Sequence, residues 1–220
     1  MTAKKILIAD DHPLFRVALS QAVAKVFPDA EIYEVNSLTE AQKEVQQSGN
    51  ISLLLLDLHM SDSHGFSGLI MFRHDHPSLP VVVVSASEEA KTIHRAIEYG
   101  AAGFIPKSTP LPQISYAIQA IMAGDIWMPE GVEEELQSLD DEEMENAARL
   151  ASLTPAQMRV LIGLTDGLLN KQIAYNMGVS EATIKAHVTA IFKKLQVNTR
   201  TQAVIMAAQL DVEVDQFSDA

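Results

Sequence analysis

The first 124 residues alternate short apolar runs with longer segments whose apolar residues recur every three or four positions. The runs have the length of β-strands, and the longer segments have the period of amphipathic helices. Strands that alternate with helices predict a parallel sheet covered by helices on both faces. The predicted strands are Ile6–Ala9, Ile32–Val35, Leu53–Leu56, Val81–Val84 and Gly103–Ile105. The predicted helices include Leu14–Val26, Leu38–Gln47, Glu88–Tyr99 and Leu111–Ala123.

The charge of the chain is distributed unevenly. The net charge is −13, which as an average opposes nucleic-acid binding. Residues 125–150 carry ten acids and one arginine, whereas residues 151–210 carry six basic residues and two acids. We therefore expect a domain over 1–124, an acidic linker over 125–150, a basic domain over 151–212 and an acidic tail over 213–220. The linker is interpreted either as a solvated, partly helical connector or as part of a switch.

The basic segment carries the start and stop signals of four helices. Thr154 with Gln157 forms a capping box, and Pro155 stands at the first helical position. A second helix, from about residue 170, ends at Gly178, and Ser180 caps a third helix soon after it. A short turn between two helices predicts a helix-turn-helix, although a four-helix bundle that binds protein has the same pattern. A fourth helix is expected over 200–210.

Two absences limit the function classes. The chain has no cysteine, which excludes disulfides and thiolate metal sites and suits a cytoplasmic protein. Apolar runs such as Leu53–Leu56 are far shorter than the roughly 20 residues that span a bilayer, so no membrane segment is expected.

Polar residues follow the predicted strands at their carboxyl ends. In an open parallel sheet these ends meet at one edge, where ligands bind. Carboxylates that are brought together repel one another unless a proton or a cation intervenes, and oxygen ligands suit Mg²⁺. An aspartate at such a site can attack phosphorus, with a hydroxyl and an ammonium group on the phosphoryl oxygens. Acids after strands are also common loop caps, so the prediction depends on the whole set: Asp10, Asp11, Asp57, Ser85 and Lys107.

Residues 4–123 resemble the receiver domain of response regulators, an α/β fold with a five-stranded parallel, flavodoxin-like sheet. The stretches that carry the resemblance are ILIADDHPLFR, LLLLDLHM, VVVVSAS and GAAGFIPKS. The resemblance implies that Asp57 is the phosphoacceptor and that Ser85, Phe104 and Lys107 are the switch and catalytic residues. It implies a magnesium site formed by Asp10, Asp11, Asp57 and the backbone carbonyl of His59. His12 is interpreted as the start of the first helix rather than as a metal ligand.

The second helix of a helix-turn-helix enters the major groove, and its N-terminal half reaches base edges. Lys185, Ala186 and Thr189 are therefore predicted base contacts. Phosphate contacts, which orient the protein without reading sequence, are predicted for Lys171, Thr183, Lys193 and Arg200. The stretch from LTPAQMRV to NTRTQAV resembles the LuxR-type helix-turn-helix. With the receiver, it makes the chain similar to the NarL/FixJ class of transcription regulators.

This resemblance implies a two-component response regulator, in which a sensor histidine kinase phosphorylates Asp57 and so switches sequence-specific DNA binding. It further implies a homodimer on an inverted-repeat promoter site. The alternatives are a phosphorylation-independent regulator that contacts RNA polymerase, and an aspartyl-phosphate phosphatase. The phosphatase is disfavoured because it needs a second aspartate where His59 stands. We therefore expect a protein that is not itself an enzyme, although it can release its own phosphoryl group.

Overall fold

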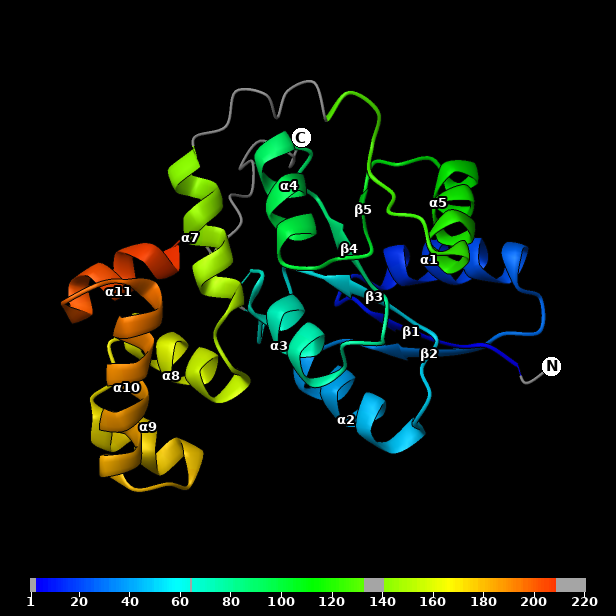
Figure 1. The fold of residues 1–220 in the computed structure, drawn as a ribbon. Coiled ribbons are helices and arrows are strands. Elements are labelled where there is room, and N and C mark those ends of the chain that lie inside the picture. Colours follow the sequence, from blue (N-terminus) through cyan, green and yellow to red (C-terminus); the bar gives the residue numbers. More distant parts are fainter. Residues whose placement is uncertain (1–2, 64, 133–140, 209–220) are drawn as a thin grey trace. The chain divides into compact units, whose positions relative to one another are not determined.

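The computed structural model describes residues 3–63, 65–132 and 141–208. Contacts divide this part of the chain into two compact units, one that holds β1 to α5 and one that holds α7 to α11 (Figure 1). The limits predicted from the sequence for the linker and the two domains remain predictions.

The first unit is a five-stranded parallel sheet in the order β2-β1-β3-β4-β5, which confirms the predicted α/β class. Its strands are β1 (Lys5–Ala9), β2 (Glu31–Val35), β3 (Leu53–Asp57), β4 (Val81–Ser85) and β5 (Gly103–Pro106). Its helices are α1 (Pro13–Val26), α2 (Leu38–Ser48), α3 (Ser67–Asp75), α4 (Ala90–Glu98) and α5 (Leu111–Ala123).

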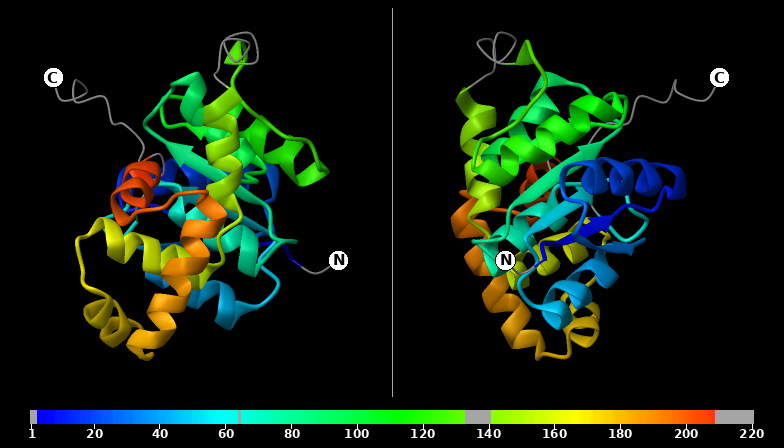
Figure 2. Two further views of the ribbon diagram at one scale, coloured as in Figure 1. Left: turned by 60° about the vertical axis from the view of Figure 1, so that its left-hand side comes forward. Right: turned by 90° about the vertical axis from the view of Figure 1, so that its right-hand side faces the viewer.

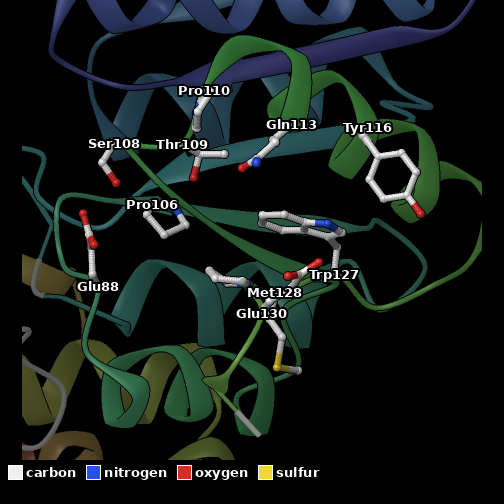
Figure 3. Close-up of a pocket in the computed structure, with 11 residues that line it drawn as sticks. Glu88, Pro106, Ser108, Thr109, Pro110, Gln113, Tyr116, Trp127, Met128 and Glu130 are labelled. Atoms are coloured by element: carbon white, nitrogen blue, oxygen red, sulfur yellow. The ribbon is translucent and has the colours of Figure 1, made fainter.

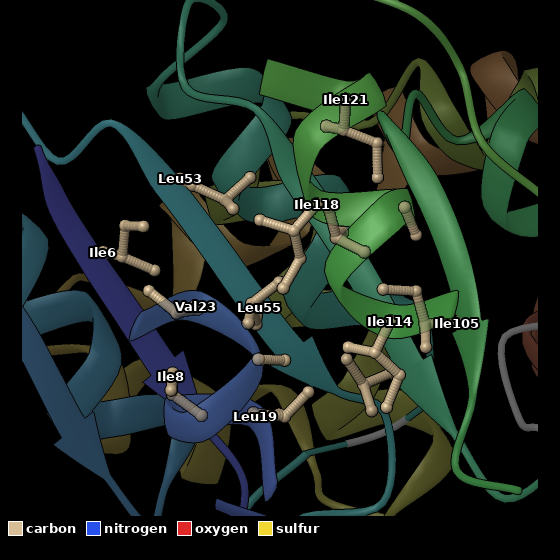
Figure 4. Packing of buried hydrophobic residues seen from close by; sticks show 14 residues of the cluster. Ile6, Ile8, Leu19, Val23, Leu53, Leu55, Ile105, Ile114, Ile118 and Ile121 are labelled. Carbon is tan, nitrogen blue, oxygen red and sulfur yellow. The ribbon is translucent and has the colours of Figure 1, made fainter. Parts of the chain in front are cut away.

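The core of this unit lies between the sheet and the helices α1 and α5, which stay together in all three views (Figures 1 and 2). Alternate residues of each strand, such as Ile6 and Ile8, point toward these two helices because side chains alternate across a strand. They meet Leu19 and Val23 of α1 and Ile118 of α5 (Figure 4). In β1, β3, β4 and β5 the intervening residues, such as Leu7 and Leu54, are equally buried, since helices cover both faces.

In the second unit, the regular elements among the described residues are all helices. They are α7 (Asp141–Ala151), α8 (Pro155–Thr165), α9 (Asn170–Met177), α10 (Glu181–Leu195) and α11 (Arg200–Ala207). The predicted capping box of Thr154 and Gln157 is present, and Ser180 accepts a hydrogen bond from the Thr183 N–H at the start of α10. Gly178 ends α9 with φ of 66°, a conformation that favours glycine. The predicted helices of this domain are therefore confirmed within the described residues.

Candidate functional sites

The structure brings together the polar residues that follow the strands of the receiver-like sheet. Asp10 comes directly after β1, Asp57 and Ser85 are the last residues of β3 and β4, and Lys107 comes directly after β5. The side chains of Asp10, Asp57 and Ser85 are all buried. Buried carboxylates need partners, because transferring an ionised group from water is unfavourable unless it is paired and hydrogen-bonded.

Lys107 is the main cationic partner of the two buried carboxylates. Its Nζ lies 2.8 Å from Asp57 Oδ2 and 2.9 Å from Asp10 Oδ2. The Lys107 N–H donates to the Ser85 carbonyl at 2.7 Å, which extends the pairing between β4 and β5 beyond the strand ends. The same ammonium group lies 5.4 Å from the centre of the Phe15 ring. One lysine therefore links three strand ends at the site.

Backbone N–H groups complete the surroundings of the carboxylates. The His59 N–H donates to Asp57 Oδ1 at 3.0 Å, and the His12 N–H donates to Asp10 Oδ1 at 2.7 Å. In both cases a carboxylate accepts from the residue two positions further on, which orients each side chain through its own loop. Ser85 Oγ accepts in the same way from the Ser87 N–H at 3.2 Å.

The oxygens of this cluster fit a small divalent cation. Ligand atoms of Asp10, Asp11, His12 and Asp57 all lie within 4.8 Å of one another. Asp10 Oδ2 and Asp11 Oδ1 are both buried. Lys107 Nζ lies 2.9 Å from the Asp10 oxygen, and His12 Nδ1 lies 2.8 Å from the Asp11 oxygen. Three carboxylates grouped this closely form the kind of oxygen donor set that Mg²⁺ prefers.

His12 lies closer to the site than the sequence indicated. It caps the start of α1, as expected, but its ring also turns toward the acids. His12 Nδ1 is 2.8 Å from Asp11 Oδ1, 3.2 Å from Asp10 Oδ1 and 3.6 Å from Asp57 Oδ2. The imidazole therefore contacts the same carboxylates that a cation would use.

Phe104 is the remaining predicted residue of the receiver site. It is fully buried in β5, and its role as a switch stays a prediction.

Arg16, which the sequence reasoning did not single out, donates from Nη1 to the Asp10 carbonyl at 2.6 Å. Its position one helical turn after His12 is the only sequence signal that points to this contact.

A further residue that the sequence reasoning missed is Asp62, in the loop after β3. Its carboxylate accepts from the Leu38 N–H at 2.8 Å, the Thr39 N–H at 2.9 Å and Thr39 Oγ1 at 2.8 Å. Burial raises the pKa of Asp62, but these hydrogen bonds lower it more, so the net pKa is below the usual 3.8. The loop that follows Asp57 is thereby tied to the first turn of α2.

Replacing Asp62 with alanine is expected to lower the free energy of unfolding at pH 7 by about 1 kcal/mol, since amides at the start of α2 lose a charged acceptor. A lowered folded pKa means that this stabilisation is present above pH 3.8 and is lost as the pH falls through the folded value. Urea unfolding of the wild type and Asp62→Ala at pH 7 and at pH 3 measures both effects. A difference in stability that does not shrink at pH 3 would contradict the assignment.

The second unit presents the exposed face of α10. Lys185, Ala186 and Thr189 are all exposed there, whereas Ile184, Ile191 and Leu195 on the opposite side are fully buried. Lys185 Nζ pairs with Glu181 Oε1 at 3.0 Å, and Thr189 Oγ1 donates to the Lys185 carbonyl at 3.0 Å. The separation of faces leaves one side of the helix free to contact a partner.

The four predicted phosphate contacts differ in the exposure and the hydrogen bonds of their side chains. Lys171 and Lys193 are exposed, on α9 and α10. Thr183 Oγ1 shares a hydrogen bond of 2.8 Å with Ser180 Oγ at the helix start. Arg200 Nη2 donates to the carbonyls of Leu164 and Leu168 at 3.0 and 2.9 Å, so this guanidinium group also holds the end of α8.

The fold and the two sites define a class of protein: an acidic receiver site on a parallel sheet, joined in one chain to a helix-turn-helix. The model for the response regulator receiver domain matches residues 6–119, and the model for the bacterial regulatory proteins of the luxR family matches residues 151–207. The chain therefore belongs to the two-component response regulators that combine a receiver with a LuxR-type DNA-binding domain. The resemblance inferred from the sequence is thereby confirmed.

Similar proteins support this assignment over nearly the whole chain. The glycerol metabolism activator of Pseudomonas putida is 42% identical over 212 residues, which cover 94% of this chain and 96% of that protein. The nitrate/nitrite response regulator NarL of Escherichia coli K12 is 29% identical, with coverage of 93% and 94%. The promoter-bound RcsB of Salmonella enterica serovar Typhimurium shares the fold at a TM-score of 0.57 and 19% identity, with coverage of 94% and 99%. Among the described residues no helix has the length and hydropathy of a membrane span.

Proposed function

We propose that a sensor histidine kinase phosphorylates Asp57 and that this modification switches the affinity of the helix-turn-helix for promoter DNA. The observation that carries the proposal is the pairing of a buried aspartate with Lys107, beside two further acids whose oxygens lie within 4.8 Å of it. Catalysis of phosphoryl transfer consists mostly of positioning and charge stabilisation. Here the buried aspartate is positioned as the nucleophile, and Lys107 stabilises charge.

In the proposed reaction, an oxygen of the Asp57 carboxylate attacks the phosphorus atom of a phosphohistidine. The phosphorus–nitrogen bond breaks, its electron pair stays on the imidazole, and Asp57 carries the phosphoryl group as an acyl phosphate. Lys107, already 2.8 Å from Asp57 Oδ2, remains as the counter-charge of a phosphoryl oxygen. Ser85 Oγ, at the end of the neighbouring strand, donates to another oxygen. Water later hydrolyses the acyl phosphate, so the protein releases its own phosphoryl group.

Asp11, Asp57 and the backbone carbonyl of His59 would hold Mg²⁺, with Asp10 completing the acidic set. When bound, Mg²⁺ neutralises charge on the phosphoryl oxygens. Asp57 itself keeps its orientation through the His59 N–H, and Asp10 keeps its orientation through the His12 N–H. The protein therefore supplies a prepared set of oxygens rather than a new arrangement at each transfer.

Replacing His12 with asparagine is expected to lower the dissociation constant for Mg²⁺ about threefold. The His12 ring contacts the oxygens of Asp10, Asp11 and Asp57, so it competes with a cation for them. Titration calorimetry with Mg²⁺ measures the change, with Asp11→Asn as the variant that should bind poorly. A weaker affinity in His12→Asn would show that the imidazole helps to hold the cation instead.

The DNA-binding part of the proposal has the chain bind an inverted-repeat promoter as a homodimer. RcsB dimers bound to DNA provide the precedent for the arrangement, and the name of the Pseudomonas putida relative favours activation of transcription. RNA polymerase is then a further proposed partner, and the cytoplasm, where promoter DNA is present, is the proposed location. Lys185, Ala186 and Thr189 read bases, while Lys171, Thr183, Lys193 and Arg200 contact phosphates.

The proposed division of the chain is a receiver over 1–124, an acidic linker over 125–150, a DNA-binding domain over 151–212 and an acidic tail over 213–220. In the structure, α7 begins at Asp141 within the proposed linker and packs against α10. If the linker is part of a switch, its acids from residue 133 to residue 143 compete with DNA for the basic helix, and most of these acids lie outside the described residues.

The experiment that tests the proposed function uses acetyl phosphate and Mg²⁺ with the intact protein. The intact mass should rise by one phosphoryl group, and the affinity for an operator selected from random DNA should change at least fivefold. A protein that binds its operator equally well with and without the phosphodonor would overturn the switch and favour a phosphorylation-independent regulator.

A further inference from the structure

A cavity of about 380 Å³ opens beside β5, apart from the acidic site. Its walls come from the loops after β4 and β5, from α5 and from the segment that follows α5 (Figure 3). This volume is within the usual range of small-molecule sites, which start at about 300 Å³. The lining residues are Glu88, Pro106, Ser108, Thr109, Pro110, Gln113, Tyr116, Trp127, Met128, Pro129 and Glu130.

The backbone holds one wall of this cavity in place. Gly124 ends α5 with φ of 106° and turns the chain back toward the sheet. Trp127 then pairs in parallel with Gly103, and its carbonyl accepts the Phe104 N–H at 2.9 Å. A Cβ on Gly103 would lie 2.8 Å from the Trp127 carbonyl oxygen, so glycine permits this close approach. These hydrogen bonds hold the backbone from which the Trp127 indole projects.

The chemistry of the lining selects one class of ligand. Trp127 and Tyr116 offer aromatic faces, and Glu88 and Glu130 offer carboxylates, while none of the described lining residues is a lysine, arginine or histidine. Figure 3 shows the Trp127 indole directed toward Pro106, with Glu88 and Tyr116 at opposite ends of the group. Cations are attracted to the faces of aromatic rings, tryptophan most strongly, and to carboxylates. An anion meets two negative charges instead.

The start of α5 offers few free backbone donors to an anion, because the N–H groups of Gln113 and Ile114 donate to the Pro110 carbonyl. This helix follows Pro110 and has proline again at position 112, and neither residue has an N–H to donate. We propose that the cavity binds a small organic cation, an amine or a quaternary ammonium compound, between the aromatic side chains and the two glutamates. The volume suits a compact molecule rather than a folded partner.

The position of the cavity links such a ligand to the acidic site. Pro106 and Ser108, which both line the cavity, flank Lys107 in the chain. The Lys107 N–H is tied to the Ser85 carbonyl at 2.7 Å and its Nζ to Asp57 Oδ2 at 2.8 Å. A cation in the cavity therefore contacts the loop that carries Lys107, and we expect it to alter the rate of phosphorylation by acetyl phosphate.

Trp127 is the only tryptophan of the chain, so its fluorescence reports on this cavity directly. The intact protein is titrated with choline, agmatine and spermidine, with benzoate as the anionic comparison, and calorimetry repeats each titration. At least one cation is expected to give a saturable signal, and benzoate none. The double variant Glu88→Gln/Glu130→Gln is expected to weaken the binding at least tenfold. Its matched control is Glu89→Gln/Asp125→Asn, which removes two nearby charges from outside the lining and should retain the affinity.

Each other outcome overturns the proposal. Absence of saturable binding in both methods excludes a cation site, and equal weakening in the two double variants indicates diffuse attraction to an acidic surface. Binding of a trilysine peptide without binding of any of the small cations would indicate a surface for a protein partner. Binding should persist in Asp57→Asn, so a failure of the phosphorylation proposal does not remove this one.

Discussion

Asp57→Asn is expected to gain no mass from acetyl phosphate and Mg²⁺, whereas the wild type gains one phosphoryl group. The amide keeps the shape of the side chain but is a poor nucleophile and cannot form the acyl phosphate. The rate of labelling should fall by at least 100-fold, and intact mass spectrometry can measure a decrease of this size. The phosphodonor-dependent change in DNA affinity should disappear with it, since both depend on one carboxylate.

A matched control separates the role of Asp57 from a general loss of negative charge. Asp75 ends α3 with its side chain about half exposed, and Asp75→Asn should be labelled like the wild type. Asp57→Asn also removes a buried charge beside Lys107, so its thermal unfolding must be measured to show that it remains folded. Labelling that persists in a folded Asp57→Asn protein would place the phosphoacceptor elsewhere.

The sheet and its acidic edge were predictable because both depend on local signals. Buried parallel strands are apolar throughout, and the residue at the carboxyl end of each strand lies at the binding edge whatever the details of packing. Asp10, Asp57, Ser85 and Lys107 could therefore be placed together from their positions alone. The helix caps at Thr154 and Ser180 are similarly local and are present in the structure.

Features that depend on distant packing could not be predicted in the same way. The helix α3 was not among the helices that the sequence indicated, because Ser67 through Phe72 are all buried and show no polar face. Trp127 was assigned to the linker, yet it pairs with Gly103 on β5. The contact of Asp62 with α2 joins residues 24 positions apart. Periodicity contains no information on these pairings.

The second prediction with a large expected effect concerns DNA binding by the exposed face of α10. Lys185→Ala is expected to weaken binding to a selected operator by about 1–3 kcal/mol, roughly 5- to 150-fold, and to relax the sequence preference at one position. In the free protein Lys185 pairs with Glu181 at 3.0 Å, with 65% of the lysine side chain exposed. Such a pair contributes little to stability, so little opposes its exchange for a base contact.

Lys193→Ala is the matched comparison, because it removes the same side chain from an exposed position near the end of the same helix. A phosphate contact should weaken binding to the operator and to unrelated DNA by similar factors and reduce the slope of log affinity against log salt by about one. Fluorescence anisotropy on both DNAs, at several salt concentrations, separates the two roles. If Lys185→Ala weakens both DNAs equally, Lys185 orients the helix without reading sequence, and base recognition must depend on Ala186, Thr189 or neighbouring groups.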